Sequence, residues 1–280
     1  MVKVGTNVVM RGDGKVALGL LCGLVESVAA LREQGVEVLL VSSGAVGLGV
    51  ERLGLPERPT ALAEVQACAA VGQSRLMALY DDAFDRLGCR IAQVLLTEDD
   101  FRDPVRHGNL RATLDSLLRL GVIPIVNEND TVSTMELERP VGPGERSRGA
   151  EGGERGERIF GDNDKLSALL MEHLGADLLV LLSDVDGLYD RDPQEPGAAV
   201  LTEVPVVDRT VLALAHGGNG RGRGGMLSKL ESVRIALDAG KQAVIANGRT
   251  PHVLERIVAG EAVGTRFGAS LERTAAGVCR

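Results

Sequence analysis

Residues 175–184 read GADLLVLLSD, and this short stretch decides the fold class of the chain. Its glycine suits the left-handed residue that ends a helix. The five apolar residues from Leu178 to Leu182 do not alternate with polar ones, which is typical of a parallel strand covered on both faces. Leucines recur at helical spacing over residues 166–174. The stretch therefore predicts a helix, a buried strand and a polar loop, in that order.

The same unit occurs four more times along the chain. Glycines at positions 35, 88, 121 and 240 each precede an apolar run, at residues 36–41, 91–96, 122–126 and 243–246. A further short strand is expected at residues 1–5, where it ends in a turn at Gly5 and Thr6. Repeated units of this kind predict an α/β fold with a doubly wound, mainly parallel sheet flanked by helices.

Polar residues follow each of these strands. Open parallel sheets bind ligands beyond the carboxyl ends of their strands. We therefore expect one crevice lined from five loops, by Thr6, Ser43, Asp130, Ser183 and Asn247. Each of these residues taken alone is also compatible with an ordinary turn.

Composition restricts the class of protein. The 280 residues are 44% hydrophobic, enough for a substantial core, and the net charge of -8 argues against broad binding of nucleic acid or anionic membranes. No signal peptide and no apolar run of about 18 residues is found, so neither secretion nor membrane spanning is indicated. The scattered cysteines make the cytoplasm the expected location. The cysteines include no C-x-x-C pair, and buried thiols are expected rather than a metal site or a disulfide, with Cys22 on an apolar helix stripe beside Leu18 and Val25.

Two segments depart from the repeating pattern. Residues 138–158 contain six Gly, two Pro, five Glu and five Arg, which predicts a flexible loop, at 139–158, between an amino-terminal half and a carboxyl-terminal half. Residues 268–280 are expected to form a loose tail.

The string Gly161-Asp162-Asn163-Asp164-Lys165 is the first candidate site. Asn163 or Asp164 can cap the helix that follows. A helix amino terminus favours anions, and an aspartate there can orient a nearby lysine. A D-N-D string alone more often forms a solvated capping loop.

The glycine-rich stretch from Gly217 to Lys229 is the second candidate. Flexible glycines let backbone amides approach phosphates, and Lys229 is expected in the first turn of the next helix. The stretch contains G-x-G-x-x-G but follows a helix rather than a strand, so it fails the context of a dinucleotide-binding fingerprint. It also resembles an RNA-binding box, but it lacks the aromatic residues that stack on bases.

Lys3 is the third candidate. An ammonium group inside a short apolar strand is costly unless it meets an anion or a carboxylate. The alternative is an edge strand with Lys3 in solvent.

Several motifs resemble those of the glutamate 5-kinases, in order and spacing, over residues 1 to 267. They are residues 2–6 (VKVGT), 42–45 (SSGA), 70–74 (AVGQS), 127–130 (NEND), 161–164 (GDND) and 224–229 (GGMLSK). Residues 183–189 and 245–248 also resemble the kinase half of pyrroline-5-carboxylate synthases.

The resemblance implies an amino acid kinase fold in a single domain, residues 1–267, with a glutamate-binding lobe at about 1–160 and an ATP-binding lobe at about 161–267. It implies that Ser43, Asp130 and Asn163 bind glutamate. Lys3 and Lys229 would flank the transferred phosphoryl group, with Asp164 between them. The implied nucleotide site comprises Lys3, Ser183, Asp184, Arg223, Gly224, Gly225, Met226, Leu227, Ser228 and Lys229, with Mg²⁺ bridging the phosphates of ATP and no protein side chain assigned to a metal.

The activity that the resemblance implies is ATP-dependent phosphorylation of the γ-carboxylate of L-glutamate, the first step of proline biosynthesis. Proline is an expected feedback inhibitor, a glutamyl phosphate reductase an expected partner, and a homodimer or homotetramer the expected assembly. The PUA domain found at the carboxyl end of many bacterial members is expected to be absent. The alternatives are an acetylglutamate or aspartate kinase, against which the set Ser43, Asp130 and Asn163 argues, and a non-catalytic amino-acid sensor on the same fold, against which Lys3, Asp164 and Lys229 argue.

Overall fold

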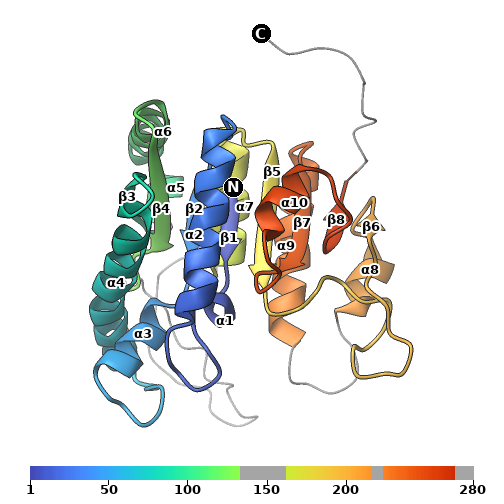
Figure 1. The fold of residues 1–280 in the computed structure, drawn as a ribbon, viewed down its shortest axis with the longest axis horizontal. Coiled ribbons are helices and arrows are strands. Elements are labelled where there is room, and N and C mark those ends of the chain that lie inside the picture. Colours follow the sequence, from blue (N-terminus) through green and yellow to red (C-terminus); the bar gives the residue numbers. More distant parts are fainter. Residues whose placement is uncertain (133–161, 216–222, 269–280) are drawn as a thin grey trace, which may run out of the picture.

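The computed structural model describes residues 1–132, 162–215 and 223–268 (Figure 1). The predicted loop at 139–158, the glycines from 217 to 222 and the tail from 269 onward lie outside these residues. The strands are β1 (Val2–Val4), β2 (Leu40–Ser42), β3 (Arg90–Leu96), β4 (Val122–Glu128), β5 (Leu178–Ser183), β6 (Glu203–Val204), β7 (Gln242–Asn247) and β8 (Thr265–Phe267). The helices are α1 (Thr6–Val9), α2 (Leu18–Glu33), α3 (Ala45–Arg52), α4 (Leu62–Asp85), α5 (Asp99–Arg102), α6 (Pro104–Arg119), α7 (Asn163–Leu174), α8 (Arg209–Leu214), α9 (Arg223–Asp238) and α10 (Val253–Val258).

The strands form one sheet in the order β3-β4-β2-β1-β5-β7-β8-β6. All neighbours from β3 to β7 are parallel, which confirms the predicted fold class. Strand β8 pairs antiparallel to β7 and was not predicted, because its three residues are too short for a periodic signal.

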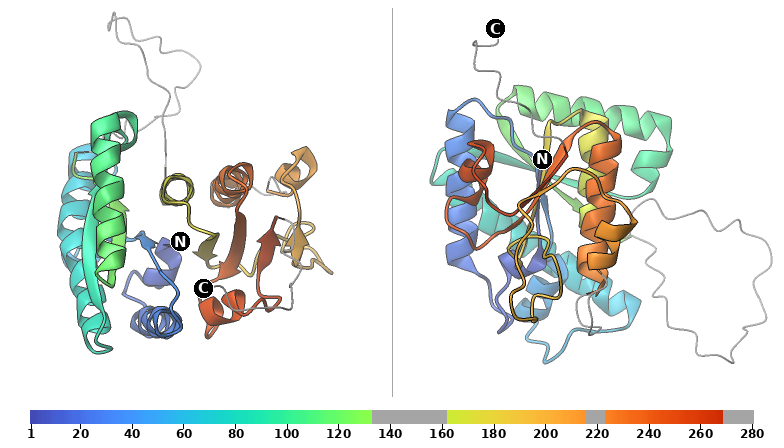
Figure 2. Two further views of the ribbon diagram at one scale, coloured as in Figure 1. Left: turned by 90° about the horizontal axis from the view of Figure 1, so that it is seen from above. Right: turned by 90° about the vertical axis from the view of Figure 1, so that its right-hand side faces the viewer.

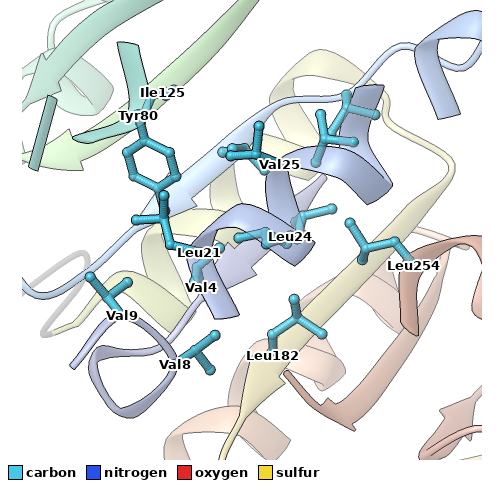
Figure 3. Packing of buried hydrophobic residues seen from close by; sticks show 14 of the residues in the cluster. Val4, Val8, Val9, Leu21, Leu24, Val25, Tyr80, Ile125, Leu182 and Leu254 are labelled. Atoms are coloured by element: carbon cyan, nitrogen blue, oxygen red, sulfur yellow. The ribbon is translucent and has the colours of Figure 1, made fainter. Parts of the chain in front are cut away.

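Helices cover both faces of the sheet, with α2 and α10 on one side and α7 and α9 on the other (Figure 2). The core on the α2 side joins β1, α1 and α2 through Val4, Val8 and Leu21, and extends to Tyr80 of α4 and Leu254 of α10 (Figure 3). The core on the α7 and α9 side includes Met171, Leu181 and Val233. Burial on both faces explains the near-continuous apolar runs of β2, β4, β5 and β7. Strand β3 differs from the expectation because it lies at the edge of the sheet, where only its last residue, Leu96, is buried.

Five predicted helix ends are confirmed by the backbone. Each of the five glycines that precede a strand has a positive φ, from 66° to 81°: Gly35, Gly88, Gly121, Gly175 and Gly240. Gly175 caps α7 in the left-handed conformation, and its N–H bonds to the carbonyl oxygen of Met171. The structure therefore confirms these glycines as the positions where the preceding helices end.

Three local expectations differ from the structure. Strand pairing begins at Leu40 rather than at residue 36, although Val38 and Leu39 are buried, because burial alone does not create ladder hydrogen bonds. The turn after Gly5 is a short helix, α1. Cys22 is exposed rather than buried, because the apolar stripe of α2 runs through Leu21, Leu24, Val25, Val28 and Leu31.

Candidate active site

The amino terminus of α7 is fixed by Asp162 and not by Asn163 or Asp164, as the sequence had suggested. The Asp162 side chain accepts hydrogen bonds from the backbone N–H groups of Asp164 and Lys165, both at 3.0 Å. Asp162 has the extended backbone that a cap requires, with φ -160° and ψ 171°. The side chains of Asn163 and Asp164 are thereby left free to face the sheet edge.

Lys3, Asp164 and Lys229 form a buried cluster of charges. The Lys3 Nζ lies 2.6 Å from Asp164 Oδ1, and the Lys229 Nζ lies 3.1 Å from Asp164 Oδ2. The three side chains are 8%, 4% and 10% exposed, in that order. Lys3 is on the central strand β1, so the alternative of an exposed edge lysine is wrong. Two ammonium groups share one carboxylate, which leaves an excess positive charge suited to an anion.

The alternation of side chains along β1 explains how a lysine enters the core. Val2 and Val4 point into the α2 side of the sheet, and Lys3 points to the side of α7 and α9. Lys229 meets it from the second turn of α9, because that helix begins at Arg223; the expected first-turn position is wrong. The carbonyl oxygen of Gly225 also accepts from the Lys229 ammonium at 3.1 Å.

A cleft of about 420 Å³ opens beside the two lysines. Its lining comes from the ends of β1 and β5 and from α9: Lys3, Gly5, Thr6, Asn7, Ser183, Asp184, Val185, Gly225, Met226 and Lys229. Asp184 accepts hydrogen bonds from Asn7 Nδ2 at 2.8 Å and from the Ser183 hydroxyl at 3.2 Å. The cleft thus contains several residues of the predicted nucleotide set. Arg223, Gly224, Leu227 and Ser228 are in the same two turns of α9, and Ser228 donates to the capping carboxylate of Asp162.

Ser43 and Asn163 meet on the other side of the charged cluster. Asn163 Nδ2 lies 2.9 Å from Ser43 Oγ, 2.9 Å from Asn127 Oδ1 and 3.3 Å from the carbonyl oxygen of Ser42. Asn163 Oδ1 is buried without a hydrogen-bond partner. The NH2 group of Asn163 is thus occupied by protein acceptors, and the atom left for a ligand is a hydrogen-bond acceptor.

Asp130 lies two residues beyond the end of β4, at the same sheet edge. Partial burial raises the pKa of its carboxyl group to about 6, with a further contribution from the charge of Glu128, whereas Arg58 acts in the opposite direction. The residue is therefore a carboxylate at neutral pH whose charge is poorly solvated. Such a group gains by pairing with a cation.

The end of β7 completes the predicted crevice. Asn247 Nδ2 donates to Asp186 in the loop after β5 at 2.8 Å. Thr6, Ser43, Asp130, Ser183 and Asn247 thus all follow or end one of five adjacent parallel strands at one edge of the sheet.

Two residues of this region were given no role from the sequence. Asn127 and Gln73 are hydrogen-bonded to each other at 2.9 Å, and Asn127 also contacts Asn163. Both stand within the motifs that carry the family resemblance, at 70–74 and 127–130. The periodicity of α4 and β4 gives no sign that these two positions differ from other interior positions. Only the family motifs could have indicated that they belong to the site.

Comparison with known proteins identifies the family of the chain. The profile of the Amino acid kinase family matches residues 1–247. The chain is 49% identical over 269 residues to the glutamate 5-kinase of Gloeobacter violaceus, which covers 95% of this chain and 67% of that protein. It is 42% identical over 270 residues to the glutamate 5-kinase of Lactiplantibacillus plantarum, which covers 96% of each.

Solved structures share the fold at low identity. The isopentenyl phosphate kinase of T. acidophilum superimposes with a TM-score of 0.61 at 18% identity, over 95% of this chain and 98% of that one. The UMP kinase from Bacillus anthracis gives a TM-score of 0.61 at 16% identity, over 96% and 95%. Within the described residues, no helix has the length and apolar character needed to cross a membrane. The family profile and the relatives together show that the chain belongs to the amino acid kinase family and, within it, to the glutamate 5-kinases.

Proposed function

We propose that this protein transfers the γ-phosphoryl group of ATP to the γ-carboxylate of L-glutamate and so forms L-glutamyl 5-phosphate, for proline biosynthesis. The observation that carries the proposal is the buried cluster of Lys3, Asp164 and Lys229. It lies between the cleft at the end of β5 and the polar group of Ser43 and Asn163.

The reaction needs no general base. A γ-carboxylate is ionised at neutral pH, and one of its oxygens attacks the γ-phosphorus while the bond from that phosphorus to the ADP oxygen breaks. No proton is transferred. The catalytic requirement is alignment of the reactants and neutralisation of charge on the phosphoryl oxygens. Lys3 and Lys229 supply that positive charge as catalytic residues, and Asp164 holds the two ammonium groups in place.

The substrate side suits an amino acid with a free ammonium group. The Asp130 carboxylate pairs with the α-ammonium, and Asn163 Oδ1 accepts a second hydrogen bond from it. Ser43, before the amino terminus of α3, donates to a carboxylate, and the helix dipole of α3 favours the same charge. An N-acetylated substrate carries no ammonium for Asp130, which disfavours an acetylglutamate kinase.

The nucleotide side lies over β5 and α9. Ser183, Asp184 and the residues from Arg223 to Lys229 bind ATP in this proposal, with Gly225 and Met226 lining the cleft. Among the described residues, no three His, Cys, Asp or Glu side chains are grouped to hold a metal ion. Mg²⁺ would enter with ATP and would neutralise part of the charge of its phosphates.

Trapping of the acyl phosphate tests the proposal. The protein is incubated with ATP, Mg²⁺ and hydroxylamine, with L-glutamate, N-acetylglutamate or L-aspartate as the acceptor. Hydroxamate from glutamate alone is expected. Hydroxamate from another acid would move the assignment to a different amino acid kinase, and none from any acid would favour the amino-acid sensor.

Regulation and assembly are further parts of the proposal. Proline as feedback inhibitor and a homodimer or homotetramer rest on the family resemblance, and a cytoplasmic location rests on the cysteine usage. A glutamyl phosphate reductase as partner is supported by chemistry as well, because an acyl phosphate hydrolyses readily and benefits from direct handover.

A further inference from the structure

Three side-chain amides form a continuous hydrogen-bonded chain beneath the proposed glutamate site. Gln73 Oε1 accepts from Asn127 Nδ2 at 2.9 Å, and Asn127 Oδ1 accepts from Asn163 Nδ2 at 2.9 Å. The three residues belong to α4, β4 and α7. The chain therefore connects a helix remote from the charged cluster to the residue beside Asp164.

Two backbone groups fix the direction of this chain. The N–H of Glu128 donates to Asn127 Oδ1 at 2.9 Å, so the Asn127 oxygen must face that side and its NH2 group must face Gln73. The Ser42 carbonyl oxygen accepts from Asn163 Nδ2 at 3.3 Å, which requires the Asn163 nitrogen on that side. Backbone donors and acceptors cannot exchange roles, so each amide has one satisfactory orientation.

The ends of the chain carry two buried atoms without a partner. One is the donor Gln73 Nε2 and the other is the acceptor Asn163 Oδ1. Removal of the Gln73 acceptor would leave Asn127 Nδ2 unsatisfied. Since the Glu128 N–H and the Ser42 carbonyl oxygen hold the two asparagine amides in their orientations, the expected response is a shift of Asn127 toward another acceptor, which weakens its hydrogen bond to Asn163 Nδ2 and loosens the Asn163 side chain.

The position of Gln73 is fixed by the packing of its helix. The neighbouring Gly72 lies where α4 touches α3, and a Cβ atom added there would stand 1.7 Å from the carbonyl oxygen of Ala45. Two turns further along α4, the hydroxyl of Tyr80 is 2.9 Å from that of Ser42. One face of α4 thus supports the ends of both β2 and β4.

We propose that Gln73 is a positioning residue for the amino-acid substrate, acting through Asn127 to keep the oxygen of Asn163 directed at the substrate ammonium. This inference rests on the proposed glutamate kinase function and adds a residue to it. Gln73 sets how well glutamate binds and leaves the nucleotide site and the transfer step unchanged.

Two substitutions at one position separate orientation from packing. Gln73→Met fills the same space without the amide, and Gln73→Glu keeps an oxygen acceptor for Asn127 Nδ2 but loses the NH2 group. Loss of one buried hydrogen bond corresponds to about a tenfold change. Q73M is therefore expected to raise KM for glutamate about tenfold, with kcat and KM for ATP within about twofold of the wild type. Q73E is expected to restore most of that loss.

Tyr80→Phe is the matched control, because it removes a buried hydrogen bond from the same face of α4 outside the amide chain. It is expected to lower Tm about as much as Q73M and to leave KM for glutamate unchanged. The dissociation constant of glutamate is measured by calorimetry on all four proteins, so the test does not depend on turnover. A wild-type protein that forms no hydroxamate from glutamate would refute the proposed function alone.

The inference itself is overturned by any of three results. Q73M could bind glutamate as tightly as the wild type, Q73E could bind as weakly as Q73M, or Y80F could weaken glutamate binding as much as Q73M does. The last two results would mean that Gln73 acts only as a packing residue of α4.

Discussion

At the residue scale, the charge of Asp130 is sensitive to pH. Its carboxyl group has a pKa of about 6, above the ordinary 3.8, because it is partly buried and close to Glu128. We expect KM for glutamate to rise as the pH falls through 6, since the protonated group no longer pairs with an ammonium. Initial rates between pH 5 and 8 measure this, and Asp130→Asn should give a high KM without that pH dependence.

The same pKa has a consequence for stability with a defined sign. The folded-state pKa is raised, so ionisation of Asp130 disfavours the folded protein increasingly from about pH 4 to about pH 6, and by a constant amount above. Asp130→Asn is therefore expected to raise Tm at pH 7 while it weakens glutamate binding. A Tm gain of equal size at pH 4 would contradict this origin.

Lys229 offers a direct test of the catalytic cluster. Lys229→Ala removes one of two ammonium groups from the phosphoryl position but leaves Asp164 paired with Lys3 at 2.6 Å. We expect kcat to fall by a factor of about 100 or more, which is the usual effect of removing one hydrogen-bond donor that stabilises a transition state. Glutamate binding should remain nearly intact. Lys241→Ala, near Asp177 just before β5 begins, is the control and should keep wild-type activity. Turnover retained in Lys229→Ala would refute the assigned role.

At the element scale, the contact between α3 and α4 depends on two glycines. A Cβ atom at Gly49 would stand 1.9 Å from the carbonyl oxygen of Cys68, and one at Gly72 would stand 1.7 Å from that of Ala45. These neighbours are backbone atoms of the facing helix and cannot rotate away. The two helices therefore pack backbone to backbone, which fixes the part of α4 that contains Gln73 against the start of α3, two residues after Ser43.

Substitution of Gly72 tests this contact. Gly72→Ala should lower the free energy of unfolding by about 2–3 kcal/mol or more, because α3 and α4 must separate. Gly23→Ala is the matched control: it lies within α2, is exposed, and its added Cβ meets no atom within 4 Å. That change should instead stabilise the protein by about 0.5–1 kcal/mol, because alanine favours a helix over glycine. Chemical denaturation measures both; an equal effect of the two variants would exclude the backbone contact as the cause.

At the scale of the whole molecule, the sheet order brings the two halves of the proposed active site together. Strand β1 lies between β2 and β5, so Lys3 stands between the proposed amino-acid side and the proposed nucleotide side. Leu40 of β2 and Val180 of β5 are far apart in the sequence, but both pair with Val2 of β1. A parallel sheet places all its carboxyl ends at one edge, which explains why distant polar loops meet there.

Much of this architecture follows from local sequence. Five glycines at helix ends and five apolar runs were sufficient to predict the α/β class, because burial on both faces imposes continuous apolar strands. The cost of a buried lysine predicted that Lys3 meets an anion or a carboxylate, and the structure shows the carboxylate of Asp164. The roles of Ser43, Asp130 and Asn163 come from the family resemblance and stay proposals.

The tertiary structure decided what depends on contacts between distant segments. In the structure, Asp162 caps α7, Cys22 is exposed to solvent, and β8 pairs with β7. Gln73 is connected to Asn163 by hydrogen bonds through Asn127. Periodicity reports which positions are buried, but a hydrogen bond between side chains depends on their partners in space. The sequence by itself therefore determined the class of fold and the charged residues of the site, and only the packing of α4, β4 and α7 decided how its amides are oriented.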